Sequence, residues 1–170
     1  MAAAAVAPSR CEVSVWDNLA KLPPFSPDLD QPGLILPVAV AELHAEVDAA
    51  DGLLIACPEY AHGIPGAFKN ALDWLVGSTA FPGKPVALIN VAPHASHAQA
   101  QLREVLTTIS ARIVREACVT IDLSGPPDRT VGADAQAILA ASLSAFLDAI
   151  SPNRGEPQCR PDGSSNAQDL

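Results

Sequence analysis

The chain has 170 residues, which is enough for one domain of about 150 residues with a short appendage and too little for a second folded domain. Hydrophobic residues make up 49% of the sequence and charged residues 17%, so we expect a compact globular protein with a sizeable core. Ten basic against 19 acidic residues give a net charge of −9, which offers no positive surface for nucleic acid or for anionic lipid.

Four β-rich runs stand out along the chain. They are Glu12–Asp17, Gly52–Cys57, Val86–Val91 and Cys118–Leu123. The second and third are almost wholly apolar, which is typical of strands covered by helices on both faces. We therefore expect them inside a parallel sheet.

Helical patterns lie between and after these runs. The expected helices are residues 37–50, with Val40, Leu43 and Val47 inward; residues 65–77, with Phe68, Leu72 and Leu75 inward; a helix carrying Leu102, Leu106, Ile109 and Ile113; and a last one with Asp134 as N-cap and Ile138, Leu139, Phe146, Leu147 and Ile150 inward. This alternation predicts right-handed crossovers and a doubly wound parallel α/β sheet.

Two segments carry turn and loop chemistry. Residues 22–33 contain four prolines and predict an ordered but irregular surface loop. Residues 151–170 are rich in Pro, Gly, Ser, Asn and Gln, which predicts a disordered tail. The expected organisation is one domain over residues 1–150 followed by this tail.

The most informative stretch covers residues 50–75, ADGLLIACPEYAHGIPGAFKNALDWL. A buried strand ends at Cys57, a proline- and glycine-bearing loop follows, and a helix begins at once. Ligands of open α/β sheets bind beyond the carboxyl ends of the strands, where this loop lies. Gly63 allows a flat ligand to approach the main chain, and Tyr60 adds an aromatic face.

This stretch resembles the NADPH-dependent FMN reductase family, a flavodoxin-like group that includes quinone, chromate and azo-dye reductases. Ten residues match the family pattern in fixed register: Pro58, Glu59, Tyr60, Ile64, Pro65, Gly66, Lys69, Asn70, Asp73 and Trp74. The resemblance extends from Cys11 to about Ile150 and implies a flavodoxin-like fold.

The resemblance also implies a cofactor and a site. In the family, the loop with the PEY sequence lies against the flavin ring, so the implied FMN-binding residues are Pro58, Glu59, Tyr60, Ala61, His62 and Gly63. NADPH would supply hydride by way of FMN to a small acceptor, either a quinone, a free flavin or a metal oxyanion, without any catalytic acid, base or nucleophile from the protein. A homodimer or homotetramer is implied as well.

The sequence departs from the family at its beginning. The family starts with a strand, a GSxRxxS-type loop that holds the FMN phosphate, and a long helix, whereas only 11 residues precede Glu12 here. The resemblance therefore implies an N-terminally truncated sheet that lacks its central strand, and weak FMN binding or none. A start placed downstream of the true one is the reading we favour. The alternative is a non-catalytic remnant that acts only through oligomeric association.

Two further departures concern the expected flavin loops. Ala61 replaces the asparagine of the family pattern, and residues 92–98 (APHASHA) replace a glycine-rich turn. His62, His94 and His97 fall near one sheet edge, but no acidic or thiol partner stands at a metal spacing, so we expect exposed histidines and no metal site.

The remaining residues of the motif have structural interpretations. We expect Glu59 to act as a cap or interface contact rather than as a general base, and Trp74 to lie in the core or at an interface. Lys69, Asn70 and Asp73 predict a hydrogen-bonded helix surface.

The cysteines and the apolar segments bear on localisation. Cys11, Cys57, Cys118 and Cys159 form no CxxC pair, and three of them adjoin apolar runs. Charged residues interrupt every apolar stretch before 18 residues, and residues 1–8 lack a basic region. We therefore expect a cytoplasmic protein with reduced cysteines, without a membrane partner.

Overall fold

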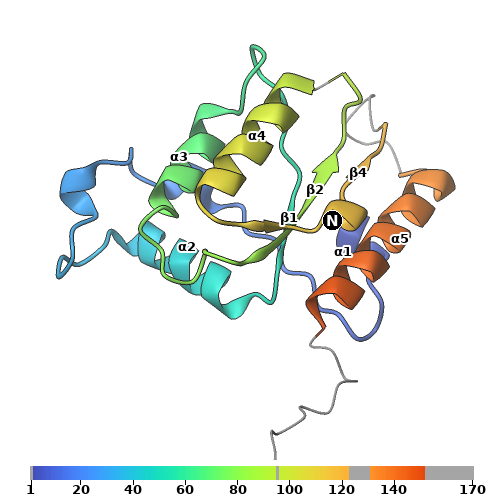
Figure 1. The fold of residues 1–170 in the computed structure, drawn as a ribbon, viewed down its shortest axis with the longest axis horizontal. Coiled ribbons are helices and arrows are strands. Elements are labelled where there is room, and N and C mark those ends of the chain that lie inside the picture. Colours follow the sequence, from blue (N-terminus) through green and yellow to red (C-terminus); the bar gives the residue numbers. More distant parts are fainter. Residues whose placement is uncertain (1, 95, 123–130, 152–170) are drawn as a thin grey trace, which may run out of the picture.

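The computed structural model describes residues 2–94, 96–122 and 131–151. Its helices are α1 (Ala2–Ala5), α2 (Val38–Ala49), α3 (Gly66–Trp74), α4 (Ser96–Thr108) and α5 (Ala133–Ile150), and its strands are β1 (Leu53–Ile55), β2 (Pro85–Asn90), β3 (Arg112–Ile113) and β4 (Val119–Thr120). Three short 3-10 turns are η1 (Asn18–Lys21), η2 (Pro27–Leu29) and η3 (Arg115–Ala117). Figure 1 shows helices on both sides of the sheet.

All strand pairs are parallel, and β2 is the centre of the sheet. β1 pairs with one side of β2, with Leu54 opposite Ala87. β3 and β4 pair with its other side. Every residue from Val86 to Asn90 is buried, as the apolar run predicted.

β3 and β4 are two parts of one interrupted sheet edge. Val86 lies opposite Ile113, and Ile89 lies opposite Val119. Three steps along β2 (89 − 86) therefore correspond to six steps along the edge (119 − 113), so the edge carries three extra residues. These form η3, which leaves the sheet and returns to it.

The alternation of side chains along β2 divides the core into two layers. Val86 and Leu88 belong to a cluster with Leu43 of α2, Leu72 of α3 and Leu102 of α4. Ala87 and Ile89 face the opposite side, where Phe146 and Leu139 of α5 cover them. The doubly wound arrangement predicted from the sequence is thereby confirmed.

Two of the expected strands differ from the structure. Residues 12–17 form neither a helix nor a strand, and Trp16 packs its side chain against the core. The run Gly52–Cys57 forms a strand of only three residues, and it lies at an edge rather than inside the sheet, because β2 is its only described strand partner. An alternating run becomes a strand only beside a neighbouring backbone, and residues 12–17 have none among the described strands.

Helix boundaries differ from expectation at two positions. α4 ends at Thr108 because Ser110 adopts a left-handed φ of 65°, so Ile113 continues the helical spacing in sequence but lies on β3. Asp134 is not the N-cap of α5; Gly132 is, and Asp134 falls in the first turn. The run Cys118–Leu123 is a strand only at β4, and Leu123 lies outside the described residues.

α5 is long and apolar enough to cross a membrane by length and composition alone. In the structure it covers the sheet through Leu139, Leu143 and Phe146, which are all buried. Its last turn closes at Ser151, whose backbone N–H and hydroxyl both donate to Leu147 O. The rest of the expected tail lies outside the described residues.

The proline-rich loop is held by the helix that follows the PEY sequence. The Asn70 amide accepts a hydrogen bond from Phe25 N–H (2.7 Å) and donates one to Pro23 O (2.9 Å). Trp74 Nε1 donates to the same oxygen, and its ring meets Phe25 edge to face at 5.1 Å. Trp74 is completely buried, so its predicted core position is confirmed.

Candidate functional site

The loop after β1 is a tight hairpin. Tyr60 N–H donates to Gly63 O (3.1 Å), and Gly63 N–H donates to Tyr60 O (3.0 Å). Between them Ala61 and His62 both have positive φ, 49° and 58°. Two consecutive left-handed residues define a type I′ turn, which favours Asn-Gly and places strain on Ala-His.

Glu59 joins this hairpin to α4. Its carboxylate accepts a hydrogen bond from Ala98 N–H (2.9 Å) in the first turn of that helix, and its side chain is only 13% exposed. The hydrogen bond from Ala98, with smaller contributions from His62 and His97, lowers the pKa of Glu59 below its ordinary value. The interpretation of Glu59 as a capping residue is confirmed, although its partner was not predicted.

The three histidines are exposed, as expected, and two of them, His62 and His97, form a pair. His62 Nδ1 lies 3.2 Å from Glu59 Oε1, and the rings of His62 and His97 meet edge to face with centroids 4.6 Å apart. His97 lies in α4 and not in a loop. Among the residues that the structure describes, no group of three or more His, Cys, Asp or Glu side chains is arranged to hold a metal ion.

A second brace comes from Gln101, which sequence reasoning missed. Its Nε2 donates to His62 O (3.3 Å), and its Oε1 accepts from Ile64 N–H (3.4 Å). A Cβ on Gly63 would lie 3.4 Å from that same oxygen. A polar residue on an exposed helix face carries no sequence signal, because this role depends on which loop packs beside the helix.

Cys57, at the start of the loop, is unsuited to nucleophilic chemistry. It is 1% exposed, and its thiol donates to Pro58 O (3.3 Å). Burial raises the pKa of Cys57 to about 11, so the thiol stays protonated near neutral pH.

The six expected binding residues are thus brought together on one loop at the carboxyl edge of a parallel sheet. The side chains of Pro58, Tyr60, Ala61 and His62 are exposed, and Tyr60 is 67% exposed. Gln99, on the first turn of α4, has a buried Nε2 without a hydrogen-bond partner in the described structure. An exposed aromatic ring and a braced main chain fit the edge of a planar, hydrogen-bonding ring.

The fold and this loop define the class of protein as a flavodoxin-like α/β protein. Residues 1–125 match the NADPH-dependent FMN reductase family, and the chain belongs to that family. The family uses FMN and NAD(P)H.

Relatives and solved structures agree with this assignment. A quinone reductase of Escherichia coli K12 is 30% identical over 116 residues, which cover 65% of this chain and 61% of the relative. A 2-hydroxy-1,4-benzoquinone reductase of a Burkholderia species is 37% identical over 125 residues, 72% of this chain and 61% of the relative. The chain therefore spans about three fifths of these relatives.

The structure is also similar to FerB, a flavoenzyme NAD(P)H:(acceptor) oxidoreductase from Paracoccus denitrificans. The two share 26% identity with a TM-score of 0.65, over 88% of this chain and 85% of the other. The flavodoxin-like fold implied by the sequence motif is confirmed by this neighbour.

Proposed function

We propose that this protein is a flavin-dependent NAD(P)H oxidoreductase that passes hydride from NAD(P)H by way of FMN to a small acceptor such as a quinone or a free flavin. The observation that carries the proposal is the braced hairpin of residues 60–63 at the carboxyl edge of β1, in a chain of the FMN reductase family.

Bound FMN supplies the hydride chemistry, and the protein supplies position. Tyr60 and the backbone of the hairpin would hold the flavin ring. The hydrogen bond from Ala98 of α4 to Glu59, together with Gln101 of α4, fixes the hairpin, so the ring would meet a rigid rather than a mobile loop. The buried Cys57 thiol stays protonated, which keeps the loop free of a competing nucleophile.

The described residues favour recognition of the ring over recognition of the phosphate. A helix N-terminus that follows a strand is the usual cradle for a phosphate dianion. At α4 the Ala98 N–H already donates to the carboxylate of Glu59, and that carboxylate would repel an anion. We therefore propose that this chain binds the flavin mainly through its ring.

A titration of the 170-residue chain with two flavins tests this proposal. FMN and riboflavin share the ring, but only FMN carries a phosphate. Fluorescence quenching should show both binding with similar dissociation constants, weaker than micromolar, and Tyr60→Ala should weaken both. Saturating flavin should then support NAD(P)H oxidation with a quinone.

Two results would contradict the proposal. Absence of binding by both flavins would remove the proposed function. Micromolar FMN binding together with much weaker riboflavin binding would show that a phosphate cradle exists and that ring recognition does not dominate.

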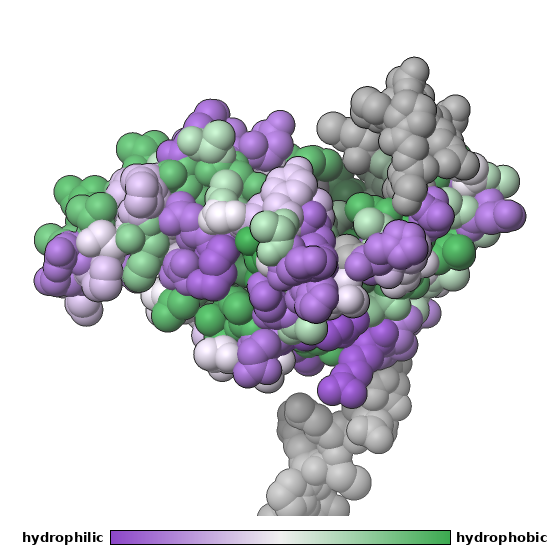
Figure 2. Space-filling model, turned by 90° about the horizontal axis from the view of Figure 1, so that it is seen from above, coloured by the Kyte–Doolittle hydropathy of each residue, from purple (hydrophilic) through white to green (hydrophobic). Residues whose placement is uncertain are grey.

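Self-association is a second part of the proposal. Leu34, Ile35 and Val38 are large apolar residues left exposed between the proline-rich loop and the start of α2, and Ile35 is 98% exposed. Figure 2 shows apolar side chains gathered at the end of the molecule where this loop lies. Such a patch favours contact with a second copy.

Light scattering at micromolar concentration tests this self-association. The wild-type protein should be a dimer or tetramer, and Ile35→Lys should shift the oligomer toward monomer. A monomeric wild-type protein would refute the proposal.

A further inference from the structure

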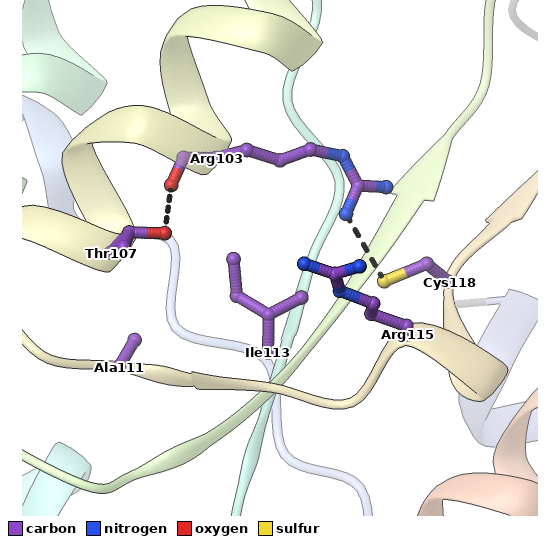
Figure 3. Close-up of a pocket in the computed structure, with 6 residues that line it drawn as sticks. All are labelled: Arg103, Thr107, Ala111, Ile113, Arg115 and Cys118. Atoms are coloured by element: carbon purple, nitrogen blue, oxygen red, sulfur yellow. Dashed lines mark hydrogen bonds between the residues drawn. The ribbon is translucent and has the colours of Figure 1, made fainter.

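A hollow of about 650 Å³ opens at the interrupted edge of the sheet, where η3 separates β3 from β4. Its lining comes from α4 and from the segment that contains β3 and η3: Arg103, Thr107, Ala111, Ile113, Arg115 and Cys118. Figure 3 shows the side chains of Arg103 and Arg115 reaching toward each other beside the sulfur of Cys118. The three extra residues of η3 place Arg115 outside the sheet, opposite α4.

Neither guanidinium group forms an ion pair in the described structure. Its ion pairs join Arg10 to Asp148, His62 to Glu59, and Lys69 to Asp73. Within the described residues, the Arg103 guanidinium makes a single polar contact, a long one to Cys118 Sγ (4.0 Å). In a chain of net charge −9, two unpaired cations facing one hollow are an arrangement that an anion would stabilise.

The other walls indicate what kind of anion fits. Ala111 and Ile113 provide an apolar surface, and the Thr107 hydroxyl already donates to Arg103 O (2.7 Å). Charge recognition therefore falls to the arginines, whose planar groups match the geometry of carboxylate and phosphate. A ligand with an oxyanion at one end and an apolar body at the other would use both walls.

The hollow is separate from the flavin loop. No residue of the loop 58–63 lines the hollow. Glu59 contacts α4 at Ala98, whereas Arg103 and Thr107 lie about 7 and 13 Å further along the helix axis. A ligand in the hollow therefore does not depend on the hairpin of residues 60–63.

We propose that Arg103 and Arg115 form a binding site for a small anionic molecule that carries a carboxylate or phosphate group on an apolar body. This site is additional to the proposed flavin site. Carboxylate and phosphate ligands share the chemistry that the arginines recognise, so the experiment compares both.

Calorimetric titration at constant ionic strength tests the site with phenyl phosphate, benzoate and the neutral benzyl alcohol as probes. At least one of the two anions should bind with a dissociation constant of about a millimolar or tighter, and benzyl alcohol should not. Whichever anion binds more tightly identifies the preferred oxyanion. Arg103→Gln and Arg115→Gln should each weaken that binding by roughly tenfold, as expected for loss of one charge-assisted hydrogen bond.

Arg112→Gln is the matched control. Arg112 lies on the same edge, but its guanidinium donates to Ala149 O of α5 (3.3 Å), outside the hollow. It removes the same charge and should leave anion binding within about twofold of wild type. Because Arg103 and Arg115 are exposed, their variants should keep the wild-type circular dichroism spectrum.

A second measurement uses Cys118 as a reporter. It lines the hollow beside Arg103, so a bound anion should slow its modification by a neutral maleimide, followed by mass spectrometry of its peptide. The proposal would be overturned if neither anion bound at ten millimolar, or if Arg103→Gln and Arg115→Gln both kept the wild-type affinity. It would also be overturned if Arg112→Gln weakened binding as much as they do, or if saturating anion did not slow the modification of Cys118.

Discussion

The carboxylate of Glu59 accepts a hydrogen bond from the backbone N–H of Ala98 over 2.9 Å. Glu59 follows β1 and Ala98 lies in the first turn of α4, the helix after β2. The bond therefore joins two segments that follow neighbouring strands of the sheet. A negative group at a helix N-terminus is also favoured by the helix dipole. The same contact shapes the loop proposed to bind the flavin ring and occupies a donor that a phosphate would use.

The first prediction concerns the pH dependence of this contact. The folded state lowers the pKa of Glu59, so its contribution to stability is present above the unfolded pKa of about 4.3 and is lost as the pH falls through the lower folded value. Glu59→Gln should be less stable than wild type at pH 7, and the difference should shrink as the pH falls. Urea denaturation at pH 7 and at pH 3 measures it; a difference of equal size at both pH values would contradict the charge-based cap.

The second prediction concerns the strained turn. Ala61 has a φ of 49°, a conformation that costs an alanine about 1–2 kcal/mol and that asparagine adopts more readily. Ala61→Asn should raise the free energy of unfolding by about 0.5–1 kcal/mol, whereas the β-branched Ala61→Val should lower it. Thermal unfolding of both variants gives the comparison. Equal midpoints would mean that the turn is not strained.

The third prediction separates two neighbours in the KN-x-x-DW motif. Asn70→Ala removes both hydrogen bonds to the proline-rich loop and leaves Phe25 N–H and one contact of Pro23 O unsatisfied. The loss should be about 1–3 kcal/mol. Lys69→Ala breaks only the partly exposed ion pair with Asp73 and should cost no more than about 0.5 kcal/mol. The losses of unfolding free energy in the two variants, measured by urea denaturation, should therefore differ clearly. Similar losses would show that the loop is anchored elsewhere.

The sequence predicted those parts of the fold that depend on local pattern. The apolar run of β2 and the spacing of Val40, Leu43 and Val47 on α2 both identified elements correctly. The end of α4 could not be predicted in this way, because Ser110 adopts the left-handed conformation without the glycine that usually signals it. The helical spacing then continued falsely to Ile113 and concealed β3.

The candidate site was also predicted only in part. The PEY loop was found from a contiguous motif, and its six residues do lie together after β1. Its supports were not found, because Ala98 and Gln101 come from a helix about forty residues later and meet the loop only when β1 and β2 are neighbours. Contacts that depend on strand order carry no local sequence signal.

The last prediction tests whether this support matters for the ring. Gln101 contacts the hairpin through both atoms of its amide, to His62 O and Ile64 N–H, and its side chain is exposed, so Gln101→Ala should change the free energy of unfolding by less than about 0.5 kcal/mol. Loss of the brace should let the hairpin fluctuate, so that ring binding has to order it again. Riboflavin affinity should therefore fall severalfold while the denaturation midpoint stays near wild type. Gln136→Ala is the control, because that amide also bonds a backbone oxygen, Val131 O, but at the far helix α5. If both variants bound riboflavin equally well, the hairpin would not be the ring-binding loop or would not need its brace.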